Sequence, residues 1–115
     1  MANESLYLVQ GTLDLLILRT LSAGAMHGYG ISQSIRERTA GAIAVQDAAL
    51  YQALRRLEER RWIHAEWGVS DNNRRARYYE LTPQGRKQLK SETALWKRYA
   101  AAVFQVLDPA TGEGR

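Results

Sequence analysis

The sequence predicts a mainly α-helical domain that carries one β-hairpin and ends in a long helix. Three observations support this fold class. Apolar residues recur at helical spacing in the first half of the chain, aromatic and β-favouring residues form two short runs after residue 61, and no helix breaker separates Gly85 from Asp108. The chain has 115 residues, a length that favours a single domain.

The first three helices follow from apolar spacing. A first helix starts near Gly11 and Thr12 and has four apolar residues on one side: Leu13, Leu16, Ile17 and Leu21. After a break in the glycine-rich segment 24–30, Ile31 and Ile35 indicate a short second helix. A third helix is predicted from about Asp47 to Arg61, with an apolar stripe of three residues: Leu50, Leu54 and Leu57.

A β-hairpin and a last helix follow. Segments 62–67 and 76–81 are predicted strands, and turn-forming residues lie between them. The Thr82 hydroxyl can accept a free backbone N–H, and Pro83 suits the first helical position, so the last helix is expected over 83–107, about 25 residues or ~37 Å. This element order is that of the winged helix-turn-helix, whose third helix enters the DNA major groove and whose hairpin, the wing, lies along the backbone or minor groove.

The expected organisation is therefore a winged helix-turn-helix domain over 10–82, a dimerisation helix over 83–107 and a disordered tail over 108–115. Sixteen Lys and Arg against twelve Asp and Glu give a net charge of +4, which favours an anionic partner such as nucleic acid or a membrane surface. The chain has no Cys, which excludes disulfides and thiolate chemistry. Without a predicted membrane span or signal peptide, we expect a cytoplasmic protein.

The third helix offers candidate base readers. At about 100° per residue, the face opposite Leu50 holds five residues: Ala48, Gln52, Arg55, Arg56 and Glu59. Gln pairs with adenine and Arg with guanine, and an Ala allows close approach to a thymine methyl. The alternative is that this charged face is simply solvated.

The tip of the predicted wing is basic. Asn73 leads into three arginines within four positions, Arg74, Arg75 and Arg77, a composition suited to phosphates or a narrow minor groove. The alternative is a charged tip that prevents edge-to-edge strand pairing.

His27 and His64 have no companion at metal or triad spacing. His27, in its glycine-rich turn, is expected to satisfy backbone groups, and His64 is expected to face solvent. We expect neither enzymatic activity nor a cofactor.

Three motifs together resemble the PadR family of bacterial transcriptional regulators, over about residues 10–107. They are His27-Gly28-Tyr29-Gly30-Ile31, Leu50-Tyr51 followed by Leu54-Arg55-Arg56-Leu57-Glu58, and Arg74-Arg75-Ala76-Arg77-Tyr78-Tyr79 leading into Leu81-Thr82-Pro83-Gln84-Gly85-Arg86. The resemblance implies a DNA-binding dimer, mostly a repressor, of the short subgroup with one helix after the wing. It also implies that Tyr51 contacts the DNA backbone.

Two features depart from the family pattern. Many members have a Ser-Pro-Gly-Thr string before Leu-Tyr, where this chain has Gln46-Asp47-Ala48-Ala49, so the N-terminal DNA contacts of the third helix fall to Gln46, Ala48 and Ala49. Members also commonly end this helix with Gly, where this chain has Arg61. Arg61 either adopts a left-handed conformation at some cost or ends the helix differently.

The last helix carries an apolar seam with spacings of 4, 3, 4, 3 and 4, which favours packing along a partner helix: Leu89, Thr93, Trp96, Ala100, Val103 and Leu107. We expect a homodimer that presents two third helices to a pseudo-palindromic double-stranded DNA site. Two copies of Trp96 near the two-fold axis would form a flat pocket for an aromatic effector, an arrangement that the family resemblance permits. The alternative is that Trp96 is an ordinary interface anchor.

The sequence therefore predicts a sequence-specific DNA-binding regulator that acts as a repressor. The competing hypothesis is a ligand-sensing or protein-interaction module on a winged-helix scaffold that does not bind DNA.

Overall fold

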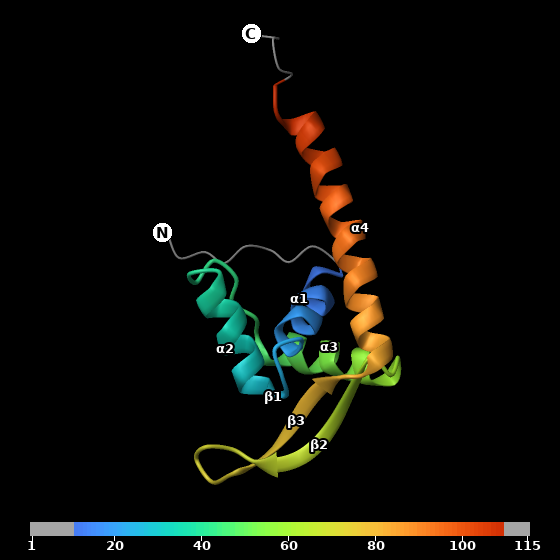
Figure 1. The fold of residues 1–115 in the computed structure, drawn as a ribbon. Coiled ribbons are helices and arrows are strands. Elements are labelled where there is room, and N and C mark those ends of the chain that lie inside the picture. Colours follow the sequence, from blue (N-terminus) through green and yellow to red (C-terminus); the bar gives the residue numbers. More distant parts are fainter. Residues whose placement is uncertain (1–10, 110–115) are drawn as a thin grey trace.

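The computed structural model describes residues 11–109. Three helices form a body: α1 (Thr12–Leu21), α2 (Gly28–Arg38) and α3 (Asp47–Glu59). A small antiparallel sheet lies beside them, with β1 (Met26–His27), β2 (Ile63–Val69) and β3 (Arg75–Leu81) in the order β1-β3-β2. The final helix, α4 (Pro83–Leu107), runs away from the body on the side opposite to the β2–β3 hairpin (Figure 1). The predicted fold class is confirmed.

Helix α2 begins earlier than the sequence predicted. The segment 24–30 was expected to be a break, but α2 starts at Gly28 because His27 caps it: the His27 Nδ1 accepts a hydrogen bond from the Gly30 N–H at 2.9 Å. His27 therefore satisfies a backbone group, as predicted. The short strand β1 was not predicted. It pairs Met26 with Tyr79 and His27 with Tyr78, and two residues are too few to produce a recognisable alternation.

Helix α3 ends two residues before the predicted Arg61. Arg61 has φ 65°, so it adopts the left-handed conformation for which Gly is the usual choice. Its N–H donates to the Glu58 carbonyl at 3.0 Å, and the Trp62 N–H donates to the Leu57 carbonyl at 3.1 Å. These two bonds form a complete Schellman motif, and they satisfy carbonyls that the end of α3 would otherwise leave free.

The hairpin matches the prediction with small shifts at its ends. Both strands have seven residues, because pairing continues two positions past Trp67 to Val69, which lies opposite Arg75. At the turn, Asn73 has φ 61°, a conformation that Asn tolerates better than most residues. The predicted tail at 108–115 lies outside the described residues except for Asp108 and Pro109, and so does the predicted domain start at residue 10.

The core forms where the apolar stripes of the three body helices meet the sheet. Its most deeply buried large side chains come from all three helices: Ile17, Leu18, Leu21, Ile31, Leu50, Leu54 and Leu57. Ile63, Tyr79 and Leu81 add the inner face of the sheet. The stripe predicted for α3 is confirmed, because Leu50, Leu54 and Leu57 are all buried. As a consequence, the opposite face of α3 is left to solvent.

The start of α4 is tied to the end of α3. The Thr82 hydroxyl accepts a hydrogen bond from the Gly85 N–H at 2.9 Å, which confirms the predicted cap, and it also donates to the Arg61 carbonyl at 2.7 Å. The Thr82 N–H donates to the Trp62 carbonyl at 3.0 Å. Gly85 packs directly on that carbonyl, and a β-carbon built on it would overlap the carbonyl oxygen and lie 2.8 Å from the carbonyl carbon.

We therefore expect Gly85→Ala to destabilise the fold by about 2–3 kcal/mol, because the added methyl group meets backbone that cannot rotate away. Gln84→Ala, one residue earlier at an exposed position, is the control and should change stability by less than about 0.5 kcal/mol. Urea unfolding followed by circular dichroism measures both. Equal stability of the two variants would contradict the close packing.

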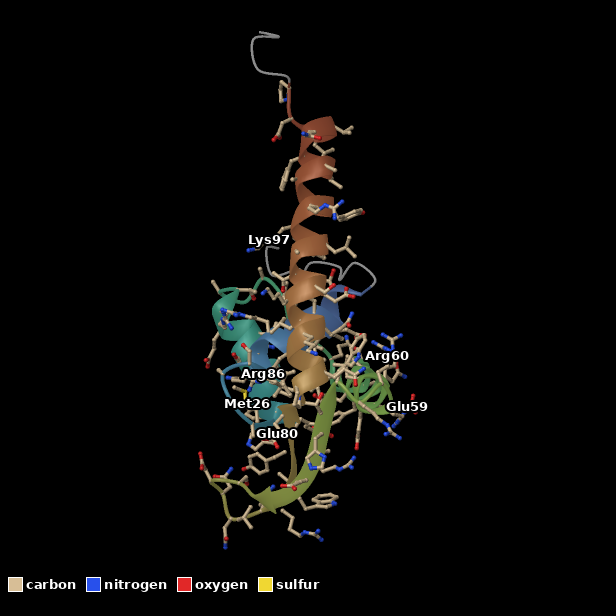
Figure 2. All side chains as sticks on the ribbon, turned by 45° about the vertical axis from the view of Figure 1, so that its right-hand side comes forward. Met26, Glu59, Arg60, Glu80, Arg86 and Lys97 are labelled. Carbon is tan, nitrogen blue, oxygen red and sulfur yellow. The ribbon has the colours of Figure 1, made fainter. Side chains whose placement is uncertain are left out.

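The outer half of α4 packs against little of the described part of the chain. Beyond Lys97, its side chains stand clear of the body (Figure 2). Several of them are large, apolar and exposed: Tyr99, Val103, Phe104, Val106 and Leu107.

Candidate nucleic-acid interface

The exposed face of α3 contains the predicted DNA-contacting residues. Every one of them is exposed in the described chain: Gln46, Ala48, Ala49, Tyr51, Gln52, Arg55 and Arg56. Asp47 lies at the N-terminal end of α3, where the helix dipole favours a negative charge. The helix thus presents two small residues near its start, followed by polar and cationic side chains.

Arg56 differs from the expectation for a base reader. Its Nη2 donates to Asp14 Oδ1 in the first turn of α1 at 2.7 Å, and the Asp14 side chain is only 17% exposed. This ion pair holds the guanidinium group against the body. Arg55, the residue before it, makes no ion pair with any described residue. Of the three predicted base readers, Gln52, Arg55 and Arg56, only Arg56 forms an ion pair within residues 11–109.

The wing tip is a hydrogen-bonded turn with exposed cations. The Ser70 N–H donates to the Arg74 carbonyl and the Asn73 N–H donates to the Ser70 carbonyl, both at 2.8 Å. Asn73, Arg74 and Arg75 are exposed. These two hydrogen bonds fix the backbone conformation of the turn, and so they fix the positions from which the three side chains project.

Trp67 is a wing residue that the sequence reasoning missed. Its side chain is 61% exposed, and the Arg75 guanidinium carbon lies 4.6 Å from the centre of its ring. Such cation–π stacking restricts where the guanidinium can point. The signal that could have found it is the strand alternation, which places Trp67 on the same face of the hairpin as Arg75 and Arg77.

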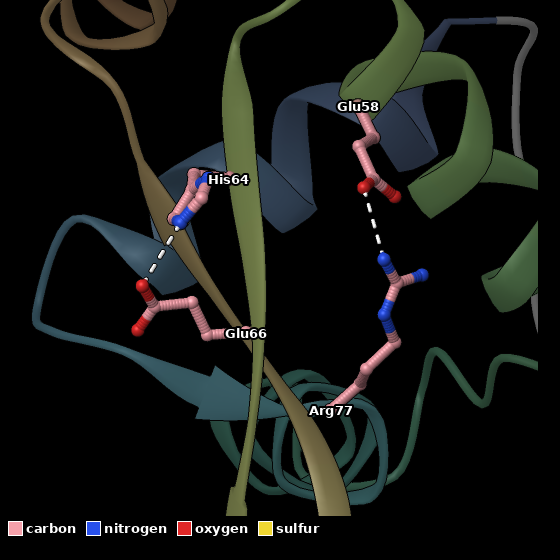
Figure 3. Close-up of polar contacts among 4 residues, drawn as sticks. All are labelled: Glu58, His64, Glu66 and Arg77. Carbon is pink, nitrogen blue, oxygen red and sulfur yellow. Dashed lines mark hydrogen bonds and ion pairs between the residues drawn. The ribbon is translucent and has the colours of Figure 1, made fainter.

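Arg77 connects the wing to α3. Its Nη2 lies 3.2 Å from Glu58 Oε2 (Figure 3). Both side chains are partly exposed, so this pair contributes at most about 1 kcal/mol. This contact orients the wing relative to α3. For Arg77 the sequence predicted a phosphate contact and not this ion pair. On the opposite face of β2, His64 is exposed as predicted and lies 3.2 Å from Glu66 (Figure 3).

An open groove of about 900 Å³ lies between α2, α3 and the wing. Side chains from all three elements line it: Tyr29 and Glu37 from α2, Tyr51 from α3, and Trp67, Arg74 and Arg75 from the wing. The structure thus places Tyr51 and the wing arginines on one concave surface.

Tyr79 lies beneath this groove, and burial raises the pKa of its phenol although the Arg77 guanidinium acts in the opposite direction. Tyr79 is therefore a neutral structural residue at physiological pH.

The predicted dimer seam is divided between core and surface. Leu89 is 9% exposed and belongs to the core of its own chain. It is buried because the first turns of α4 pack on α1, and its place in a dimer interface stays a prediction. Trp96 is 40% exposed, and its Nε1 donates to the Thr12 hydroxyl at 3.3 Å. Val103 and Leu107 are exposed, and Thr93 and Ala100 are half-buried.

Within 11–109, no three His, Asp or Glu side chains gather as a metal site would require. In the same residues, no helix is both long enough and apolar enough to cross a bilayer.

Comparison with known proteins identifies relatives that match most of the chain. A family model described as the transcriptional regulator PadR-like family matches residues 17–91. A Lysinibacillus sphaericus protein called uncharacterized protein X is 35% identical over 102 residues, which are 88% of this chain and 89% of that protein.

Solved structures agree with this family match. A transcriptional regulator from Clostridium thermocellum is 31% identical, with a TM-score of 0.76 over 84% of this chain and 93% of the other. A PadR family transcription regulator from hypervirulent Clostridium difficile R20291 is 28% identical, with a TM-score of 0.73 over 84% of this chain and 99% of the other. The chain therefore belongs to the PadR-like family of transcriptional regulators.

Proposed function

We propose that this regulator is a cytoplasmic repressor that binds a pseudo-palindromic DNA operator as a homodimer. The observation that carries the proposal is the shared groove, because it brings Tyr51 of α3 together with Arg74 and Arg75 of the wing. A DNA strand between the major groove, entered by α3, and the minor groove, entered by the wing, would lie along such a surface. Repression follows when the operator overlaps a promoter.

The division of labour among the residues follows from their charge and placement. Arg74, Arg75 and Arg77, together with Tyr51, contact phosphates and position the protein, whereas Gln52 and Arg55 read base edges. Ala48 and Ala49 let the start of α3 approach the bases closely. The protein acts by binding alone and performs no catalysis.

The salt dependence of binding tests this proposal. If each protomer neutralises about four phosphates, log K against log salt concentration should have a slope of roughly −7 for the dimer. The operator for this measurement comes from selection of bound fragments out of a random DNA pool, which also reports half-site spacing and symmetry. A nearly salt-independent affinity, or no selected sequence, would favour the competing ligand-sensing or protein-interaction module.

The homodimer is supported by the exposed apolar side chains of the outer half of α4, which residues 11–109 of a single chain leave uncovered. The aromatic effector stays a prediction from the sequence. Trp96 keeps an exposed indole on the dimer seam, as such a pocket needs, but its hydrogen bond to Thr12 equally suits an interface anchor.

A further inference from the structure

Gly28, the first residue of α2, is buried beneath the side chain of Tyr51. A β-carbon built on Gly28 would overlap the Tyr51 hydroxyl oxygen, and it would lie 2.7 Å from Cζ and 2.9 Å from Cε1. Non-bonded carbon atoms pack at about 3.5–4.0 Å. The Tyr51 phenol therefore occupies the space that a side chain at position 28 would fill.

The backbone at position 28 does not itself require glycine. Gly28 is absent from the described residues with positive φ, which are Gly11, Gly24, Ala40, Gly41, Arg61 and Asn73. Glycine is also less favourable than alanine at helical positions, because it loses more conformational freedom on folding. The packing of Tyr51 is the feature of the structure that explains a glycine here.

The Tyr51 hydroxyl is available to a ligand. The side chain is 45% exposed and lines the groove between α2 and the wing together with Arg74 and Arg75. Within residues 11–109, its hydroxyl makes no hydrogen bond to protein. A phenol O–H can donate to a phosphate oxygen.

We propose that Gly28 is a positioning residue for DNA binding: by leaving room for the phenol ring, it holds the Tyr51 hydroxyl in the groove, where it donates to a backbone phosphate. This inference rests on the proposed DNA-binding function. Because the collision involves the far end of an exposed side chain, an alanine at this position turns Tyr51 out of the groove and leaves the fold intact.

A double-mutant cycle on DNA tests the inference with four proteins: wild type, Gly28→Ala, Tyr51→Ala and the double variant. Gly28→Ala and Tyr51→Ala should each lower operator affinity, roughly tenfold to a hundredfold for each half-site that loses a hydrogen bond to a charged phosphate. The double variant should bind no more weakly than Tyr51→Ala. The slope of log K against log salt should keep the wild-type value in all four proteins, since a neutral phenol releases no counterion.

A second cycle measures stability without DNA, by urea unfolding of the same four proteins. In the wild-type background, Gly28→Ala should lower stability, because the methyl group displaces the packed ring. In the Tyr51→Ala background the space is empty, so the same change should raise the folding constant by up to about fivefold, the advantage of alanine over glycine in a helix. This reversal of sign would show that the two positions are in contact.

Together, the two cycles distinguish failure of the positioning role of Gly28 from failure of the proposed DNA-binding function. If Gly28→Ala binds DNA as wild type does, or weakens binding equally in both backgrounds, the positioning role is overturned while the DNA-binding function stands. If no protein in the set binds DNA but the stability effect reverses, the proposed function is overturned together with the phosphate contact. The packing of Tyr51 on Gly28 then remains as a structural contact only.

Discussion

Replacing both Arg74 and Arg75 with alanine should lower operator affinity about a thousandfold at 0.1 M salt, and the dimer's slope of log K against log salt should change from roughly −7 to roughly −3.5. Both side chains are exposed at the wing, and neither forms an ion pair with a described residue. A dimer loses four phosphate contacts through this change, and each contact contributes about 0.9 to the slope.

The matched control is the double lysine variant, Arg74→Lys with Arg75→Lys. It keeps the charge and should keep most of the slope, although a lysine lacks the planar fork that grips a phosphate with two hydrogen bonds. Titrations from 0.05 to 0.3 M salt, by gel shift or fluorescence anisotropy, measure all three proteins. If wild type and the double alanine variant retain DNA equally, the wing is not a DNA contact and the interaction-module hypothesis gains support.

Placing glutamate at both Val103 and Leu107 should convert the proposed homodimer into a monomer and weaken operator binding by about a hundredfold to ten-thousandfold, because the second half-site then no longer binds as part of the same molecule. Both residues lie on the predicted seam and are exposed in the single chain, at 36% and 68%. A homodimer would bury their side chains. Unpaired carboxylates there would have to lose their hydration, which costs several kcal/mol for each ion.

Gln105→Glu is the control for this change. Gln105 is exposed on the same end of α4, but at about 100° per residue it points away from Val103 and Leu107. This variant should remain dimeric. Size-exclusion chromatography with light scattering measures the assembly, and the selected operator measures affinity. If the double glutamate variant stays dimeric, the chains associate through a different surface.

Residue patterns over short stretches of sequence were sufficient to predict most of the helices and strands. Thr82 and Pro83 predicted the start of α4, and the absence of breakers predicted its extent to Leu107, as observed. Apolar spacing predicted the buried stripe of α3 and therefore which of its residues face outward. Composition alone indicated the basic tip of the wing. Each of these features depends on residues within a few positions of one another, so the chain's own order encodes it.

Contacts between residues far apart in the sequence were not predicted and are seen only in the tertiary structure. Asp14 and Arg56 are 42 positions apart, and Glu58 and Arg77 are 19 apart, yet these pairs hold Arg56 against the body and orient Arg77 relative to α3. The burial of Leu89, the strand β1 and the fit of Tyr51 over Gly28 are of the same kind. A hydrophobic pattern states which face of an element is buried, but partners across the core depend on how the elements pack, because packing alone brings such side chains within contact distance.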